Sequence, residues 1–560
     1  MFSNKENINI LTSLLVSHGV RHVVVCPGSR NAPLIHNFNE CEDIECYPVT
    51  DERSAGFYAL GMSLATDETV AVCVTSGTAL LNLSPAVAEA TYRHHGLIVI
   101  SADRPSAWIG QLDGQTLPQA GALGCFVDRC VNLPEPHDEE EHWYCNRIVN
   151  EALLAVRRNS RKSVQINVPI SEPLFCFNVP DLPCERKIHS IKPQLDVEAI
   201  LGIMVKDLLS AERPMIVVGQ INRRSTALHN ALSKLEKRFA VLSEPLSDGT
   251  QRLFDLVLSV IDESSCYKPD FLLYVGDTIV SKRLKQLLRK TENAKIWAVS
   301  EDGEIHDTFK HLTGVIEGAP VKILSLLADN TDDGSTNKFA TSWNECMDDI
   351  EKMAHDCALG YSQLAVVKKF ESMLDNLDYG FQVHYANSTA VRLACIFASH
   401  YVWCNRGVNG IEGSVSVAAG HSMVTDDIVF CVTGDLSFFY DQNALWNVNI
   451  RNNLRIILLN NHCGGIFYSL KGLRDSAAFK NLVAAGHNAT AHGICEQNKV
   501  MYISTHNTDE LCSGLEIVTE KNSQRPILLE VFTDAEEDKR VIKYFMNHIK
   551  TSWEKESGSL

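Results

Sequence analysis

Short apolar runs recur along the chain and alternate with longer stretches of mixed polarity. In the first third, four runs rich in β-branched residues are each followed closely by Gly, Ser or Pro, and they occupy 23–25, 70–74, 97–100 and 164–168. Runs of this kind are typical of parallel strands covered by helices on both faces. The pattern therefore predicts an α/β domain over residues 1–180.

The same alternation returns twice further along the chain. The proline-rich segment Ser171–Pro193 predicts a connector. A second α/β domain over 194–330 is indicated by runs at 214–218, 239–242, 271–275 and 296–299, and the polar stretch Asp329–Asn337 closes it. A third, over 345–560, is indicated by runs at 401–404, 428–432, 455–459 and 527–531. We predict the α/β class with three consecutive doubly wound parallel-sheet domains, whose ligands bind outside the carboxyl ends of the strands.

Composition and charge narrow the possible partners. The 560 residues are 45% hydrophobic and 21% charged, which is ordinary for a multidomain globular protein. A formal charge of −18 argues against nucleic acid or an anionic membrane as a partner. The sequence shows no signal peptide and no apolar stretch long enough to span a membrane, so we expect a cytoplasmic protein. The 18 cysteines form no C-x-x-C pair, which disfavours zinc and redox sites.

Two polar motifs follow predicted strands of the third domain. One reads Thr433-Gly434-Asp435-Leu436-Ser437, and the other runs from Asn460 through Asn461 and Cys463 to Gly465. The Asp435 carboxylate, the Asn461 amide oxygen and the Cys463 carbonyl would supply three of the oxygens that Mg²⁺ requires, with Mn²⁺ as the alternative ion. Either motif alone is more often a turn or a loop. Their combination at strand ends resembles the Gly-Asp-x … Asn-Asn signature of thiamine-diphosphate enzymes, which implies that Gly434, Leu436 and Ser437 also lie at the cofactor.

Two further positions become candidate cofactor contacts if the chain has a thiamine site. Glu52 opens an apolar helix after Thr50-Asp51, where an acid usually only compensates the helix dipole. Thiamine diphosphate, however, needs a carboxylate at N1′ of its aminopyrimidine to generate the reactive ylid, and Glu52 is the catalytic candidate. Ile411 lies in the segment 405–413 with its three evenly spaced glycines. A bulky aliphatic residue there can hold the cofactor in its bent conformation.

The chain resembles the 2-succinyl-5-enolpyruvyl-6-hydroxy-3-cyclohexene-1-carboxylate synthases of menaquinone biosynthesis over essentially its whole length. The matching stretches are 27–34, 50–53, 75–79, 101–105, 405–413 and 434–437. The resemblance implies decarboxylation of 2-oxoglutarate and 1,4-addition of the succinyl carbanion to isochorismate. It also implies a pyrimidine-binding first domain, a diphosphate- and Mg²⁺-binding third domain, and a homodimer or homotetramer in which these domains of neighbouring subunits face each other.

Both substrates implied by the resemblance are dicarboxylates, so cationic side chains are required on an acidic protein. The resemblance assigns to the isochorismate side Ser29, Arg30, Arg104 and Gln115. It assigns to the cofactor and the oxo acid Asn387, Ser388, Arg392 and Arg406. Further substrate contacts, or an effector site, are implied at Lys282 and Arg283. An apolar wall that keeps water away is implied at Ile466, Phe467 and Leu470.

The chain also departs from the family pattern. The metal loop reads Asn-Asn-His-Cys-Gly-Gly where the family often has Asn-Asn-Asp-Gly-Gly-Gly, Glu412 replaces an aspartate, and Gly114 replaces an asparagine. Two alternatives stay open from the residues. One is another thiamine-dependent carboligase or 2-oxo acid decarboxylase. The other is a non-catalytic thiamine-diphosphate-binding protein, against which the presence of Glu52 argues.

Overall fold

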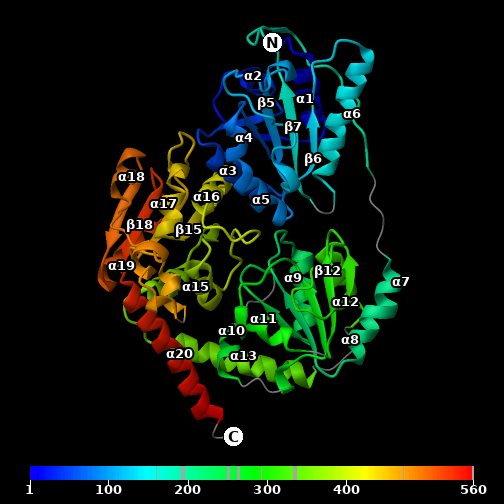
Figure 1. Cartoon of the computed structure of the whole chain (residues 1–560). Helices are drawn as coiled ribbons and strands as arrows, with labels where there is room; N and C mark the ends of the chain where they lie inside the picture. The colour runs from blue at the N-terminus through cyan, green and yellow to red at the C-terminus, as the bar shows by residue number, and fades with distance from the viewer. Residues whose placement is uncertain are drawn as a thin grey trace.

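The computed structural model contains three parallel β-sheets in succession along the chain (Figure 1). The residues it describes are 1–158, 161–190, 196–248, 253–261, 265–291, 293–331, 337–470 and 472–557. Parts of the predicted connector Ser171–Pro193 and of the polar stretch Asp329–Asn337 lie outside these residues. The predicted α/β class with three parallel-sheet units is confirmed.

The first unit is a six-stranded parallel sheet in the order β3-β2-β4-β5-β7-β6. Its strands are β2 (His22–Val25), β3 (Glu45–Pro48), β4 (Ala71–Val74), β5 (Ile98–Asp103), β6 (Val127–Asn132) and β7 (Ser163–Pro169). Its helices are α1 (Glu6–Ser17), α2 (Ala32–Glu40), α3 (Glu52–Thr66), α4 (Thr78–Asn82), α5 (Ser84–Tyr92) and α6 (Glu139–Ala155), with 3₁₀ turns η1 (Ser106–Trp108) and η2 (Gly124–Phe126). A separate antiparallel pair joins β1 (Phe2–Ser3) to β8 (Phe177–Val179), which lies within the predicted connector.

The second unit is a five-stranded parallel sheet in the order β10-β9-β11-β12-β13. Its strands are β9 (Pro214–Val218), β10 (Ala240–Ser243), β11 (Phe271–Val275), β12 (Lys295–Ser300) and β13 (Leu312–Glu317). Its helical segments are α7 (Val197–Ala199), η3 (Ile200–Val205), α8 (Lys206–Ser210), α9 (Thr226–Glu236), α10 (Phe254–Val260), η4 (Ser265–Tyr267), α11 (Lys282–Arg289) and α12 (Pro320–Asp329). Helix α13 (Lys338–Asp356) follows and packs against β10 and α20.

The third unit is a five-stranded parallel sheet in the order β14-β15-β16-β18-β17. Its strands are β14 (Phe381–Tyr385), β15 (Ile428–Gly434), β16 (Leu454–Asn460), β17 (Met501–Thr505) and β18 (Ile527–Phe532). Its helices are α14 (Gln363–Leu374), α15 (Thr389–Phe397), α16 (Ser414–Met423), α17 (Asp435–Tyr440), α18 (His492–Gln497), α19 (Thr508–Thr519) and α20 (Ala535–Ser557), and its shorter turns are η5 (Gln442–Leu445), η6 (Gly465–Ser469), η7 (Leu473–Asp475) and η8 (Phe479–Val483).

One predicted strand of the third unit is wrong. Residues Tyr401–Cys404 form no strand, and only an isolated bridge joins Trp403 to His384 of β14. The Trp403 amide donates to the Val383 carbonyl at 2.9 Å. The chain then leaves the sheet edge for the loop 405–413, so the apolar run is buried without extending the ladder.

The first and third units are joined by the close packing of α3 against α16 (Figure 1). A Cβ atom added at Gly61 would lie 2.0 Å from the Val417 carbonyl oxygen, and one at Gly420 would lie 2.2 Å from that of Tyr58. Glycine is therefore required on both helices for this approach. A single hydrophobic core runs across the contact and includes Tyr58 and Val417, so the two units form one packed body.

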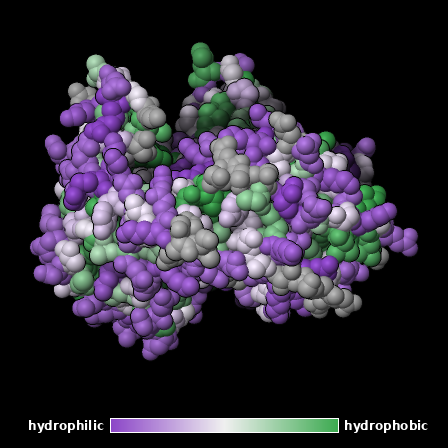
Figure 2. Space-filling model, turned by 90° about the horizontal axis from the view of Figure 1, so that it is seen from below, coloured by the Kyte–Doolittle hydropathy of each residue, from purple (hydrophilic) through white to green (hydrophobic). Residues whose placement is uncertain are grey.

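The surface seen in Figure 2 is mostly hydrophilic, with hydrophobic residues in scattered groups. In the described part of the chain, no helix is both long and apolar enough to cross a membrane.

Candidate functional site

The Glu52 region forms at the carboxyl edge of the first sheet. Helix α3 begins at Glu52, and Asp51 caps it by accepting a hydrogen bond from the Ser54 amide at 3.0 Å. Glu52 lines a cavity of about 220 Å³ together with the loop 75–79 that follows β4 and with Gln115. The structure therefore brings two of the predicted site residues, Glu52 and Gln115, to one cavity.

Arg30 and Arg104 lie at the same edge, after β2 and β5, and each is neutralised by one acid. Arg30 pairs with Glu172 at 3.0 Å and donates to the Ile170 carbonyl at 3.0 Å. Arg104 pairs with Asp113 at 2.8 Å. Ser29 is exposed beside them. A substrate carboxylate bound at either arginine would compete with the acid already there.

Asp435 is the first residue of α17 and lies at the carboxyl end of β15. Its side chain is 3% exposed, and burial raises its pKa. Its Oδ1 accepts from the Leu436 amide at 2.7 Å, and its Oδ2 accepts from the Cys463 amide at 3.0 Å. The two predicted metal motifs are thus in direct contact. His487 Nε2, which the sequence did not suggest, lies 3.3 Å from Asp435 Oδ2.

Asn461 is held by an acid from the carboxyl-terminal helix. Its Nδ2 donates to Asp538 Oδ2 at 3.2 Å. Asp538, on α20, also accepts from the Gln363 amide and from the Thr533 hydroxyl, both at 2.8 Å. Because Asp538 accepts from the nitrogen of the amide, the Asn461 Oδ1 is directed away from Asp538. The Cys463 thiol donates to this oxygen at 3.8 Å, and an amide oxygen has a second lone pair for a metal.

The donor set at this edge fits a hard divalent cation. It consists of the Asp435 carboxylate, the Asn461 amide oxygen and the Cys463 carbonyl, which are ligands of the type Mg²⁺ and Mn²⁺ prefer. A Cβ atom at Gly434 would meet no atom within 4 Å, so there is open space beside Asp435. No group of three or more His, Cys, Asp or Glu residues placed to hold a metal occurs among the described residues. The remaining ligands would have to be diphosphate and water.

The loop 405–413 gathers further predicted residues around Asn387. The Asn387 Nδ2 donates to the carbonyls of Asn405 and of Gly410, the latter at 2.8 Å, and its Oδ1 accepts from Arg406 Nη1 at 3.1 Å. The Ser437 hydroxyl donates to the Ile411 carbonyl, which ties the loop to the metal motif. The Ile411 side chain is 42% exposed, so it is available to a cofactor or to a neighbouring molecule.

A cavity of about 530 Å³ lies between the second and third units. Predicted residues that line it are Lys282, Arg283, Arg392, Asn461 and Ile466, and the carboxyl-terminal helix α20 contributes Asp538 and Lys539. Arg392 donates to the carbonyl of Ser388, which has a strained φ of 73°. Phe467 packs beside Cys463 and Phe479, and Leu470 is exposed.

The cations around this cavity differ in their partners. Arg283 pairs with Asp255 at 2.5 Å. By contrast, neither Arg392 nor Arg406 has a carboxylate within 4 Å anywhere in the described ranges, and the Arg406 Nε is buried without a hydrogen-bond partner. Burial, followed by the neighbouring Arg406, lowers the pKa of Arg392. Two adjacent cations without a carboxylate in direct contact favour the binding of an anion at this position.

Glu244 is a second acid that the sequence did not suggest. It lines the same cavity, and its carboxylate accepts from the amides of Val280 at 2.7 Å and Ser281 at 2.8 Å. Burial raises its pKa to about 7. These bonds fix the turn that enters α11, where Lys282 and Arg283 lie.

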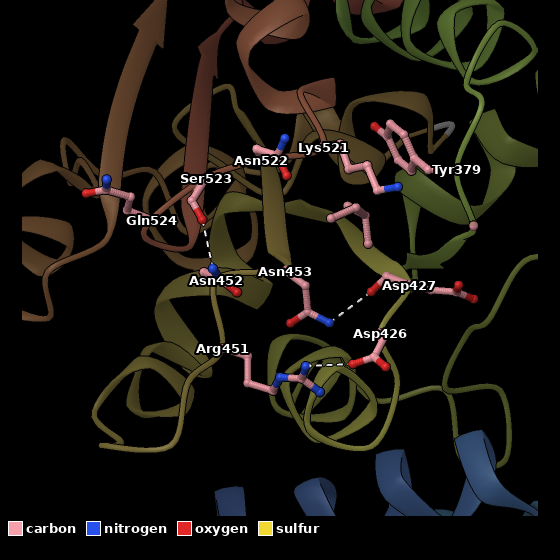
Figure 3. Close-up of a pocket in the computed structure, with 12 residues that line it drawn as sticks. Tyr379, Asp426, Asp427, Arg451, Asn452, Asn453, Lys521, Asn522, Ser523 and Gln524 are labelled. Carbon is pink, nitrogen blue, oxygen red and sulfur yellow. Dashed lines mark hydrogen bonds and ion pairs between the residues drawn. The ribbon is translucent and has the colours of Figure 1, made fainter.

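Another cavity, of about 660 Å³, lies at the opposite edge of the third sheet (Figure 3). It surrounds the amino ends of β15 and β16, where Arg451 pairs with Asp426 at 2.9 Å and Asn453 donates to the Asp427 carbonyl at 2.9 Å. None of the predicted site residues lines it. Parallel sheets bind ligands at their carboxyl edge, so this cavity is not part of the candidate site.

Comparison with known proteins agrees with this geometry. A family model described as "Thiamine pyrophosphate enzyme, N-terminal TPP binding domain" matches residues 8–122. The class indicated by this match is that of the thiamine pyrophosphate enzymes.

The particular family follows from full-length relatives. The 2-succinyl-5-enolpyruvyl-6-hydroxy-3-cyclohexene-1-carboxylate synthase of Bacteroides thetaiotaomicron is 41% identical over 98% of this chain and 100% of its own length. The synthase of Phocaeicola vulgatus is 42% identical over 98% of this chain and 99% of its own length. The synthase of Porphyromonas gingivalis is 34% identical over 98% of this chain and 98% of its own length. The chain belongs to this synthase family, and the predicted family and enzyme class are confirmed.

Proposed function

We propose that this protein decarboxylates 2-oxoglutarate and adds the remaining four-carbon acyl unit to isochorismate in a 1,4-addition, releasing CO₂ and forming 2-succinyl-5-enolpyruvyl-6-hydroxy-3-cyclohexene-1-carboxylate. Membership of the synthase family supports the reaction. The observation in this chain that carries the proposal is the pair formed by the half-buried Arg392 and the buried Arg406, neither of which has a carboxylate within 4 Å among the described residues. Such a pair suits an anionic oxo acid beside the cofactor loop.

Thiamine diphosphate is the cofactor of the proposed reaction, and when bound it supplies the electron sink for loss of CO₂. The residues that would hold it are divided between two edges. Glu52 would place its carboxylate at the aminopyrimidine and share a proton there. Asp435, Asn461 and the Cys463 carbonyl would bind the diphosphate through Mg²⁺ or Mn²⁺. Ile411 would support the bent cofactor from the loop 405–413.

The substrate residues have separate roles in the proposal. Arg392 and Arg406, with Asn387 and Ser388, bind and orient the oxo acid. The acceptor is bound through Ser29, Arg30, Arg104 and Gln115, with Lys282 and Arg283 as further contacts or as an effector site. The aliphatic and aromatic side chains that limit access of water are Ile466, Phe467 and Leu470. Charge-assisted bonds in a cavity shielded from water are stronger than those on the surface.

The proposed assembly is a homodimer or a homotetramer. Glu52 and Asn461 line different cavities of one chain. This supports a site built from the pyrimidine-binding unit (1–180) of one subunit and the diphosphate-binding unit (345–560) of another. The central unit (194–330) lies between these two units in the sequence. Exposed apolar side chains near α4 and α17 support such a contact, and they include Leu81, Tyr440, Trp446 and Val448. We assign the protein to the cytoplasm.

The function is tested with purified protein, thiamine diphosphate, Mg²⁺, 2-oxoglutarate and isochorismate. We expect loss of isochorismate absorbance and a product of the predicted mass only when all four small molecules are present. Release of CO₂ without loss of isochorismate would instead identify another thiamine-dependent carboligase or a simple decarboxylase. Absence of both, with thiamine diphosphate bound, would favour a non-catalytic binding protein.

A further inference from the structure

A buried acid of the first unit binds the loop that carries Arg406 and Ile411. Glu89 lies near the end of α5 and is 3% exposed. Its Oε1 accepts from the Gly407 amide at 2.8 Å, and its Oε2 accepts from the Val408 amide at 2.7 Å. One carboxylate therefore receives two consecutive backbone N–H groups from a segment more than three hundred residues away. Hydrogen bonds to an ionised acceptor are short and strong.

The charge of Glu89 is not neutralised by Arg93. Arg93 lies one turn later on the same helical path, a spacing at which opposite charges commonly pair. Its Nε and Nη2 instead donate to Asn222 Oδ1 of the second unit, at 3.1 and 2.7 Å. No ion pair to Glu89 is present among the described residues. The two loop amides are the groups that satisfy this buried carboxylate.

The fit between Glu89 and the loop is close. A Cβ atom at Gly407 would lie 2.8 Å from the Glu89 carbonyl oxygen and 3.2 Å from its Cδ. Real Cβ atoms do not approach that closely to a backbone oxygen, so a side chain at position 407 would push the loop away from α5. The same Cβ atom would lie 3.0 Å from Arg93 Cγ, so the position of the loop is set by contact with the backbone and carboxylate of Glu89 and with the side chain of Arg93.

The Gly407–Val408 segment that Glu89 binds lies between two functional positions. Arg406 precedes Gly407 directly, and Ile411 follows Val408 by three residues. Asn387 ties the loop at Asn405 and Gly410, while Glu89 holds the residues between these two ties. A shift of the 407–408 amides would therefore move the Arg406 side chain relative to the oxo acid and the Ile411 side chain relative to the cofactor.

We propose that Glu89 is a positioning residue of the cofactor and oxo-acid site, which acts by fixing the Gly407–Val408 amides and through them Arg406 and Ile411. This inference rests on the proposed cofactor site. It assigns to the first unit a role within the same chain that is separate from that of Glu52. A purely structural role would require only that the first and third units stay packed together.

The test compares Glu89→Gln with Tyr58→Phe in the full-length protein. Glutamine keeps the size but offers one acceptor, and it places an N–H₂ group against a backbone N–H. Tyr58→Phe is the matched control, because it also removes a buried hydrogen bond between the first and third units, from the Tyr58 hydroxyl to the Ala444 carbonyl at 2.6 Å, without touching the loop. Hydrogen exchange of peptides covering 405–413 is measured in the apo protein, and thiamine diphosphate affinity is measured by fluorescence titration.

We expect Glu89→Gln to exchange faster in 405–413, to bind thiamine diphosphate about 10 to 100-fold more weakly, and to show a raised KM for 2-oxoglutarate. Tyr58→Phe is expected to lower thermal stability without any of these three effects. Wild-type cofactor affinity and KM in a folded Glu89→Gln protein would overturn the inference. Failure of the wild-type protein to bind thiamine diphosphate would instead overturn the proposed site.

A second variant covers the case in which Glu89→Gln does not fold. Gly407→Ala leaves Glu89 intact and displaces the loop from the other side of the contact. We expect it to reproduce the loss of cofactor affinity and the faster exchange of 405–413. Unchanged affinity in this variant would also overturn the inference, because the close approach at Gly407 would then have no bearing on the site.

Discussion

Replacing Arg406 by methionine tests whether this arginine serves a ligand or the fold. Arg406 is 8% exposed, and its Nη1 donates to Asn387 Oδ1 at 3.1 Å. Its Nε is buried without a hydrogen-bond partner, and no carboxylate lies within 4 Å of it among the residues that the structure describes. A buried, unpaired cation lowers the stability of the fold. The residue is therefore expected to be retained for an anionic substrate.

The expected effect is large for activity and small for stability. Loss of a two-bond arginine fork to a carboxylate costs about 3–6 kcal/mol, at about 1.5–3 kcal/mol for each charge-assisted bond. The kcat/KM for 2-oxoglutarate should fall about 10²- to 10⁴-fold. In the apo protein, methionine removes an unsatisfied buried group, which gains about 1–3 kcal/mol, and loses one charge-assisted bond to Asn387, which costs about 1.5–3 kcal/mol. The two contributions nearly cancel, so the apo variant should unfold close to the wild-type temperature.

Arg451→Met is the matched control for this experiment. Arg451 lies at the opposite edge of the same sheet, where it pairs with Asp426 at 2.9 Å (Figure 3). It also donates to the Thr425 carbonyl at 2.8 Å. We expect its loss to lower the unfolding temperature and to leave the steady-state kinetics unchanged. The reasoning would be refuted if Arg406→Met turned over 2-oxoglutarate within a few-fold of wild type, or lost stability as Arg451→Met does.

Three other perturbations address the remaining parts of the site. Glu52→Gln is expected to lower the turnover number by about 10²- to 10⁴-fold while thiamine diphosphate still binds, and wild-type turnover in steady-state assays would exclude its role in proton transfer. Asp538→Asn places an N–H₂ group against Asn461 Nδ2 and so removes the bond that orients this metal ligand. Activation should then require an Mg²⁺ concentration about 10 to 100-fold higher, and an unchanged Mg²⁺ titration would contradict this role. Burial raises the pKa of Asp441 to about 6 from its ordinary value of 3.8. The folded protein thus holds a proton that the unfolded chain releases, so the free energy of unfolding should fall by up to about 3 kcal/mol as the pH rises from about 4 to about 6. Denaturant titrations should show this slope in wild type and not in Asp441→Asn.

The strands that the apolar pattern predicted and those that it missed differ in their place in the sheets. Interior strands such as β4 and β16 are buried throughout and read as continuous apolar runs. The missed strands β3, β6, β13, β14 and β17 all lie at sheet edges. One side of an edge strand meets solvent, so polar residues interrupt its pattern. The edge strand β10 was predicted because it is fully buried and packs against α13.

The residues that carry chemistry were easier to predict than the residues that hold them. Asp435 and Asn461 stand in recognisable motifs at strand ends, where the requirements of a hard metal limit the residue types. Glu89, Glu244 and Asp538 were missed because each is an ordinary acid in local sequence. Their significance comes from backbone amides or an amide side chain that only the folded chain brings to them. Short-range patterns contain no signal for such contacts.

The placement of Glu52 and Asn461 in different cavities of one chain has a genetic consequence. If each working site takes its glutamate from one subunit and its metal ligands from the next, a chain inactivated at Glu52 and a chain inactivated at Asp435 carry complementary defects. Mixed assemblies of the two would contain one site in which both halves are intact. Two alleles that each yield inactive protein alone would then yield active protein together, and inactivating lesions in this gene would fall into two complementation groups, one for each end of the polypeptide.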